Sequence, residues 1–185
     1  MFLLLVLATM MIAGTVLLTN VGDFYGKRFT QDMRAAFAER ELSAGLAAAA
    51  KSGGAASIRD MLALYSSVRL GINQHRNYCI LDAQTGAYLY GSYDDPGGVT
   101  PQKTPNIIAA MNGGVGDHVD LTANVMDYAF YLPGEGQAGV VVCVLDDKNE
   151  MQSVMQSIFW IILQALGWGL GISFGLGFVL SHNIT

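Results

Sequence analysis

Charged residues are absent from both ends of this 185-residue chain. Residues 1–22 and 151–185 contain no Asp, Glu, Lys or Arg, and all ten basic and fifteen acidic residues lie from Asp23 to Glu150. This distribution excludes an ordinary soluble domain at either end. Residues 1–22 and 158–180 instead have the length of about 20 apolar residues that crosses a membrane, and the need to satisfy backbone groups in lipid predicts that both are helices.

The first apolar stretch also lacks the marks of a cleaved signal peptide. No basic region precedes it, it exceeds the usual apolar length of about 7 to 15 residues, and no clear small-x-small site follows it. We therefore expect an uncleaved membrane anchor. Lys27 and Arg28, the basic residues closest to a span, would place the middle of the chain in the cytoplasm by the positive-inside rule, but the outer flanks are too short for comparison. Charge alone leaves the orientation open.

Residues that carry chemistry are scarce as well. Two cysteines 64 positions apart do not make a metal site, and Asp94 and Asp95 next to a proline are typical of a turn. No G-x-S-x-G motif is present, the net charge of −5 gives no basic patch for nucleic acid, and the glycines of "GWGLGISFG" lie inside an apolar span rather than in a phosphate loop. We expect no catalytic residue, metal or cofactor. The histidines are interpreted as solvated or locally hydrogen-bonded: His75, His118 and His182.

The middle of the chain begins with two helical patterns. Apolar residues at every fourth position and an alanine-rich end predict a helix over residues 23–50, which "KSGGAAS" then interrupts. Ser57 with Asp60 resembles a capping box that opens a second helix, and Gly71 ends it.

Five extended segments follow these helices. Gly86 suits the left-handed position of a tight hairpin loop, Thr104 with Pro105 predicts the N-cap and first turn of a short helix, and Asp147 with Glu150 predicts the cap of an exit helix that continues into the second span. Together they predict an α+β domain, an antiparallel sheet with helices on one side. The expected strands are 78–82, 87–92, 118–122, 125–132 and 139–145.

Three stretches carry a resemblance to a known family. The hairpin "ILDAQTGAYLYGS", the segment "TPNIIAAMNGGVGD" and the closing "VVVCVLDDKNEM" before a second span resemble the extracytoplasmic sensor region of bacterial membrane-bound histidine kinases, of the single Cache or PAS-like class. The tail "LSHNIT" is similar to the start of a HAMP linker, although His182 and Asn183 stand where family members commonly have basic residues. The resemblance implies transmembrane helix 1 at 1–22, an extracytoplasmic Cache/PAS-like sensor domain at 23–150, an exit helix and transmembrane helix 2 at 151–181, and the start of a cytoplasmic linker at 182–185.

What the resemblance implies for function is the sensing half of a two-component receptor. Such a protein is a homodimer in the bacterial cell membrane, where a small-molecule or protein ligand shifts the second span and a kinase core passes the signal to a response regulator. That core is not in this sequence, so the chain itself is not expected to be an enzyme. A chemotaxis-type or cyclic-nucleotide-signalling receptor could carry the same sensor. A non-enzymatic, two-span accessory protein that binds a partner is the alternative from another class.

Two sets of residues are candidates for structural roles. Gly167, Gly171 and Gly175 lie on one face of the second span, where small residues let membrane helices approach closely, so we expect packing on a second copy or on the first span. Cys79 and Cys143 fall on the first and last strands, which are neighbours in a PAS-like sheet. A disulfide and two buried free thiols are both compatible with that placement.

A ligand pocket is expected between the sheet and the segments "YDDPGGVTPQK" and "NIIAAM", as the resemblance implies. An arginine there could bind a carboxylate and tyrosines could line the walls, while the opposing interpretation is that tyrosines simply suit strands and the arginine is solvated. The candidate ligand-binding residues are Arg76, Tyr78, Tyr90, Asp127, Tyr128 and Tyr131.

Overall fold

The structure, a computed structural model, describes residues 2–92, 102–134 and 139–184. The chain forms two compact units. One contains Tyr25–Asn149, and the other contains Met1–Phe24 together with Glu150–Thr185.

The first unit is built on a five-stranded sheet in which all neighbouring strands are antiparallel, which confirms the predicted sheet. The strand order is β2-β1-β5-β4-β3, so the last strand lies at the centre. Its sequence "VVVCVLD" is apolar at successive positions because both of its faces are buried. The strands are β1 Arg76–Asp82, β2 Tyr88–Gly91, β3 Val115–Gly116, β4 Met126–Leu132 and β5 Val140–Asp146.

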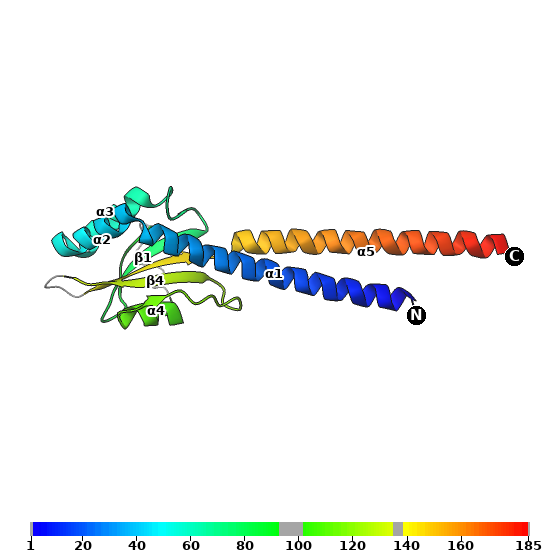
Figure 1. The fold of residues 1–185 in the computed structure, drawn as a ribbon, viewed down its shortest axis with the longest axis horizontal. Helices are drawn as coiled ribbons and strands as arrows, with labels where there is room; N and C mark the ends of the chain where they lie inside the picture. Colours follow the sequence, from blue (N-terminus) through cyan, green and yellow to red (C-terminus); the bar gives the residue numbers. More distant parts are fainter. Residues whose placement is uncertain (1, 93–101, 135–138, 185) are drawn as a thin grey trace. The chain divides into compact units, whose positions relative to one another are not determined.

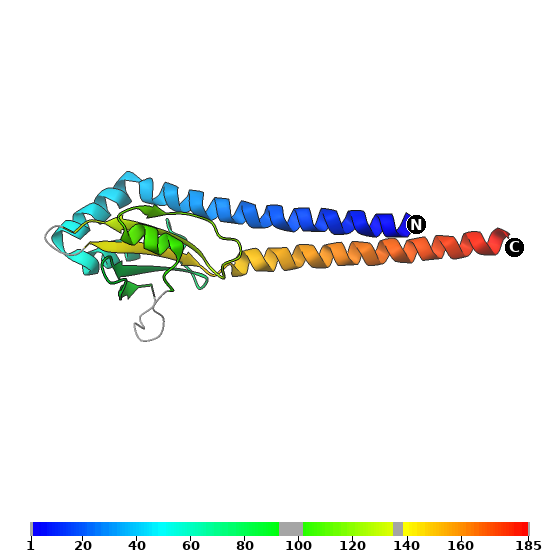
Figure 2. The ribbon, with the colours of Figure 1, turned by 90° about the horizontal axis from the view of Figure 1, so that it is seen from below.

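Helices cover both faces of this sheet, whereas the sequence predicted helices on one side. Figures 1 and 2 show α2 and α3 on one face and α4 on the other. The short helix α4 buries Ile107 and Ala110 against the second face, because alternate residues of the central strands are apolar on that side too. The helices are α1 Phe2–Ala38, α2 Arg40–Ser52, α3 Gly54–Tyr65, α4 Pro105–Met111 and α5 Asn149–Ile184.

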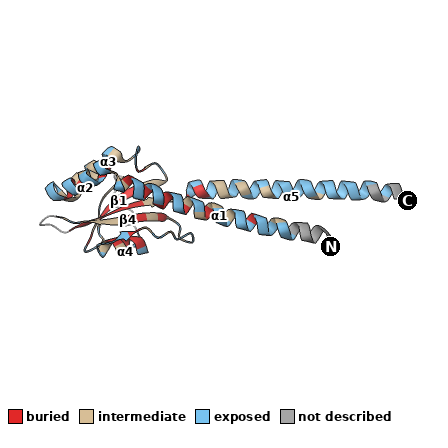
Figure 3. Ribbon diagram, in the orientation of Figure 1, coloured by how far each residue is buried: buried red, intermediate tan, exposed pale blue. Residues whose placement is uncertain are grey.

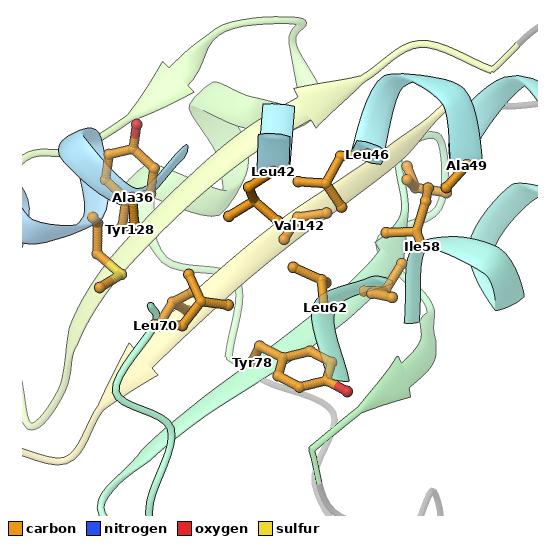
Figure 4. Close-up of a cluster of buried hydrophobic side chains, with 14 of the residues drawn as sticks. Ala36, Leu42, Leu46, Ala49, Ile58, Leu62, Leu70, Tyr78, Tyr128 and Val142 are labelled. Atoms are coloured by element: carbon orange, nitrogen blue, oxygen red, sulfur yellow. The ribbon is translucent and has the colours of Figure 1, made fainter. Parts of the chain in front are cut away.

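The larger core lies between the sheet and helices α1, α2 and α3. Leu42 and Leu46 of α2 and Ile58 and Leu62 of α3 are spaced by four residues, so each pair faces the sheet, where Val142 of β5 meets them. Figure 4 shows these side chains together. In Figure 3 the buried residues of the first unit follow the central strands and the inner sides of these helices.

Two local predictions about helix ends have different outcomes. The Thr104 side chain accepts a hydrogen bond from the backbone N–H of Ile107 at 3.1 Å, so the predicted N-cap of α4 is confirmed. The predicted Ser57 cap is wrong, because α3 already begins at Gly54 and Ser57 lies inside it. A break at Glu39, between α1 and α2, was not predicted because no glycine or proline marks it.

The third expected strand is also misplaced. Residues 118–122 form no strand, and β3 consists of Val115 and Gly116. The reason lies in Asp120, whose carboxylate accepts hydrogen bonds from the backbone N–H groups of Thr122 and Ala123 and from the Thr122 hydroxyl. These local bonds offer the backbone an alternative to a strand ladder.

The second unit contains the apolar ends of α1 and α5. Among the described residues one helix, α5 over Asn149–Val179, is long and apolar enough to cross a membrane, with a mean hydropathy of 1.6 and none of its most apolar window buried. Figure 3 shows the same exposure along α5. A Cβ placed on Gly14 of α1 would lie 3.4 Å from Cδ1 of Ile162, so the two helices are in contact there. Among the described residues, the helix over the expected first span, residues 1–22, does not meet the same criterion of length and hydropathy.

Candidate functional site

The six predicted ligand-binding residues do not meet in one place. Arg76 and three of the tyrosines lie on the face of the sheet covered by α1, α2 and α3, whereas Asp127 and Tyr131 lie on the face covered by α4. The alternation of side chains along a strand causes this division. The segment "YDDPGGVTPQK", expected to cover the pocket, includes residues 93–101, and Asp94 and Asp95 with them, which are outside the described residues.

Arg76 is engaged by neighbours within the domain. Its Nε donates to Oδ2 of Asp146 at 3.0 Å and its Nη1 donates to the carbonyl oxygen of Leu70 at 3.3 Å. The guanidinium also lies over the ring of Phe29, 5.2 Å from the ring centroid. Arg76 therefore joins β1, the end of β5 and helix α1 in this structure.

The tyrosines on this face contribute to packing. Tyr78 is 5% exposed and Tyr128 is 6% exposed, and both belong to the larger core. The Tyr128 ring stacks on Phe37 with 5.8 Å between centroids. Half-buried Tyr90 lies under the guanidinium of Arg59, which is 5.0 Å from the ring centroid.

Asp127 belongs to a buried polar network at the start of α4. The Thr104 hydroxyl donates to Oδ2 of Asp127, and the amide nitrogen of Asn106 donates to Oδ1 at 3.0 Å and to the Asp127 carbonyl at 2.9 Å. Asn106 also exchanges hydrogen bonds with the backbone of His118. Burial raises the pKa of Asp127, although the bonds from Thr104 and Asn106 oppose the increase. The network fastens α4 to β4.

The network also explains a glycine of β3. A Cβ on Gly116 would overlap the backbone of Asn106, so only glycine permits this approach of β3 to α4.

Cys79 and Cys143 are opposite each other on β1 and β5, as the resemblance implies, and both are buried free thiols. The Ala83 N–H donates to the Gly139 carbonyl, so these two residues form a hydrogen-bonded pair four positions along the ladder. Because hydrogen-bonded and non-hydrogen-bonded pairs alternate in an antiparallel ladder, Cys79 and Cys143 are also a hydrogen-bonded pair. Cβ atoms of such pairs are about 5.5 Å apart, whereas a disulfide requires about 3.5 to 4.5 Å. A bridge would therefore require the two strands to move together. The hydrogen bond with Cys79, followed by burial, raises the pKa of Cys143 well above its usual range.

The glycine face of α5 is open in this structure. A Cβ placed on Gly167, Gly171 or Gly175 would have nothing within 4 Å. The face expected to pack on another helix is therefore not used by α1 among the described residues.

A group of charged contacts lies where β5 ends and α5 begins, at residues 146–149, which we call the β5–α5 junction. Lys148 is the central residue: its side chain is 2% exposed, and its ammonium donates to the carbonyl oxygens of Asp120 at 2.8 Å, Leu121 at 3.2 Å and Ala123. Burial lowers the pKa of Lys148, and the carboxylates of Asp120 and Asp146 oppose the decrease.

The backbone at Lys148 is unusual too. Its φ of 60° lies in the left-handed region, which non-glycine residues rarely adopt. The Lys148 N–H donates to Oδ1 of Asp146 at 2.9 Å, so one carboxylate receives both this bond and the Arg76 bond. Contacts of a buried cation thus stabilise a strained conformation at the point where the chain leaves the sheet.

A second carboxylate completes the junction. Asp147 accepts from the Asn149 N–H at 2.9 Å, and its Oδ2 lies 3.0 Å from Nδ1 of His75, the residue before β1. The backbone N–H of Asp147 donates to the His75 carbonyl at 3.0 Å. Burial acts to raise the pKa of Asp147, but the hydrogen bonds from Asn149 and His75 outweigh it and lower the pKa.

Sequence reasoning missed Lys148, Asp146 and Asn106. The available signal is the charged run "DDKN" directly after a buried strand, which by itself predicts only a helix cap. The acceptors of Lys148 are 25 to 28 residues away, in a segment that was taken for a strand. Nothing local indicated that this lysine is buried.

These observations define an α+β domain with a PAS/Cache-compatible sheet, and one helix able to cross a membrane begins where its central strand ends. No protein-family model, curated protein or solved structure matches this chain.

Proposed function

We propose that this chain is the signal-sensing half of a membrane receptor, most similar to a two-component sensor histidine kinase. The observation that carries the proposal is the β5–α5 junction: the central strand of the sheet leads within three residues from Asp146 to Asn149, the start of the apolar helix α5. The buried ammonium and the left-handed backbone of Lys148 lie at this point and support a role of the junction in relaying a signal.

The mechanism is a shift between two arrangements of the junction. A ligand that favours one arrangement of the sheet alters the contacts of Lys148 and Arg76 with the end of β5, and α5 carries the displacement into the membrane. The ligand must interact differently with the two arrangements, because equal binding to both shifts nothing.

The proposal includes a membrane topology. The first apolar segment, residues 1–22, is a second span, and the sheet domain is outside the cytoplasm of a bacterial cell. The hydroxyls of Thr15 and Thr19 donate to carbonyls of their own helix, at 2.9 and 3.0 Å, as polar groups in lipid must find a partner internally. The chain forms a homodimer through the open glycine face of α5, and the signal reaches a response regulator through a kinase core.

Cysteine crosslinking in membranes tests the relay. Single cysteines at positions 158–171 of the full chain report contacts between α5 helices of a dimer, while the native cysteines are buried. We expect Lys148→Met, which removes the buried ammonium, to change which positions crosslink. Lys103→Met is the matched control, because Lys103 is exposed and donates to a turn carbonyl at 2.9 Å. A Lys148→Met chain that unfolds cooperatively and crosslinks like the wild type contradicts the relay.

Surface labelling tests the topology. A cysteine at the exposed position Ala47 of α2 should react with a membrane-impermeant maleimide in intact cells. Reaction only after the cells are opened would place the domain in the cytoplasm.

A further inference from the structure

A hollow lies at the end of the sheet opposite the β5–α5 junction. Its volume is about 190 Å³, and it is open to solvent and bordered by the turn between α2 and α3, the ends of β1 and β4 and the starts of β2 and β5. Buried Ala50, Ile58 and Val140 contribute to its lining, and half-buried Ala55 adds to it. None of the six ligand residues predicted from the sequence lines it.

One charged side chain, Asp82, is among the residues that line the hollow. Its Oδ1 accepts three hydrogen bonds from the hairpin turn: from Gln84 N–H at 3.0 Å, Thr85 N–H at 2.7 Å and the Thr85 hydroxyl at 2.8 Å. Within the part of the chain that the structure describes, Oδ2 has no hydrogen-bond partner. The turn therefore fixes the carboxylate and leaves one oxygen for a ligand.

We propose that this hollow binds a small primary alkylammonium ion, with the ammonium on Asp82 and the hydrocarbon chain against Ala50, Ala55, Ile58 and Val140. A hydrogen bond between a carboxylate and an ammonium is stronger than a neutral one, and the apolar wall favours a short hydrocarbon body. The volume limits the ligand to a few carbon atoms. That this ion is the ligand of the sensor rests on the proposed function.

The surroundings argue against other small ligands. The one carboxylate among the described lining residues does not supply the six oxygens of a hard metal ion, and no group of three or more His, Cys, Asp or Glu that could hold a metal occurs among the described residues. An anion would lie next to the Asp82 carboxylate, and no lysine or arginine is among the described residues of the lining.

Binding of n-butylammonium to the full chain in lipid nanodiscs tests the site, with n-butanol and butyrate as probes of the same length. Calorimetry should give a dissociation constant of about 1 mM for a ligand of five heavy atoms. We expect n-butanol to bind about tenfold more weakly and butyrate not at all. Equal binding of n-butanol and n-butylammonium would overturn the proposal without any variant.

Asp82→Asn should reduce n-butylammonium affinity about tenfold, since it removes the charge and keeps an oxygen for the turn. Asp120→Asn is the matched control for n-butylammonium affinity alone, because Asp120 contacts Lys148 at the junction: it receives the same kind of turn bonds from Thr122 and Ala123 but is not among the residues that line the hollow. Ala55→Leu should abolish binding by filling the space. Unchanged affinity in both Asp82→Asn and Ala55→Leu would disprove the site.

Two further measurements separate a free amine from a lysine of a partner protein, and the binding site from the relay. Tighter binding of Nα-acetyl-lysine amide than of n-butylammonium would show that the hollow accepts a lysine of a partner protein, which overturns the free-amine proposal. Binding that leaves α5 crosslinking unchanged supports the site and counts against the relay, whereas crosslinking that responds to Lys148→Met without any n-butylammonium binding does the reverse.

Discussion

The two ends of the β1–β5 strand pair have opposite character. At one end Arg76 pairs with Asp146, and at the other Asp82 pairs with Val140. The Asp146 carboxylate receives hydrogen bonds from Arg76 and from the Lys148 backbone, whereas the Asp82 carboxylate, among the described residues, accepts hydrogen bonds only from its own turn through Oδ1. The charged residues at the junction end are thus held in contacts within the domain, whereas at the far end Asp82 lines a hollow and its Oδ2 has no hydrogen-bond partner among the described residues. Under the proposed function, the hollow end is the sensing end and the junction is the transmitting end.

Among variants at the two ends of the sheet, Lys148→Met should have the largest effect on the free energy of unfolding. The change leaves the carbonyls of Asp120, Leu121 and Ala123 without the ammonium, so we expect the free energy of unfolding to fall by about 3 kcal/mol. Urea denaturation of the full chain in detergent measures the loss. Lys103→Met should change it by less than about 0.5 kcal/mol, and equal effects of the two variants would show that the junction is not held by the buried cation.

An intermediate effect should appear in the pH dependence of stability, through Asp127 of the α4 network and Asp147 of the junction. The pKa of Asp127 is raised, so its contribution is fully present below the unfolded pKa of about 3.9 and is lost as the pH rises through the folded pKa. The pKa of Asp147 is lowered, so its contribution is present above about 3.9 and is lost as the pH falls through the folded pKa.

Denaturation of Asp127→Asn and Asp147→Asn between pH 3 and pH 7 should therefore change the pH profile in opposite directions. In the wild type, Asp127 makes the domain less stable as the pH rises, and Asp127→Asn abolishes this decrease. Asp147 makes the domain less stable as the pH falls, and Asp147→Asn abolishes that decrease. Changes of the pH profile in the same direction would contradict burial as the cause of the raised pKa of Asp127 and hydrogen bonding as the cause of the lowered pKa of Asp147.

The smallest effect is expected at the far end of the sheet. Ala55→Leu adds apolar atoms to the hollow, so the free energy of unfolding should stay within about 1 kcal/mol of the wild-type value or rise. The same denaturation experiment measures it. A loss as large as that of Lys148→Met would show that the hollow is filled by tight packing rather than open to a ligand.

The sequence predicted the parts of this fold that depend on local patterns. Alternating and continuous apolar residues predicted β1, β4 and β5, Thr104 with Pro105 predicted the start of α4, and the charge-free end predicted the apolar helix α5. Each of these signals lies within the element it predicts, because periodicity, capping and apolar length are properties of neighbouring residues.

The tertiary structure decided what distant segments do to one another. It placed α4 on the second face of the sheet, distributed the six predicted ligand residues over two faces, and buried Lys148 among carbonyls of a segment that looked like a strand. It also brought Asp82 to the edge of a hollow lined by residues of α2, α3 and β5. None of these contacts has a local signal, since each arises from the pairing of segments far apart in the chain, whose partners only the packed core specifies.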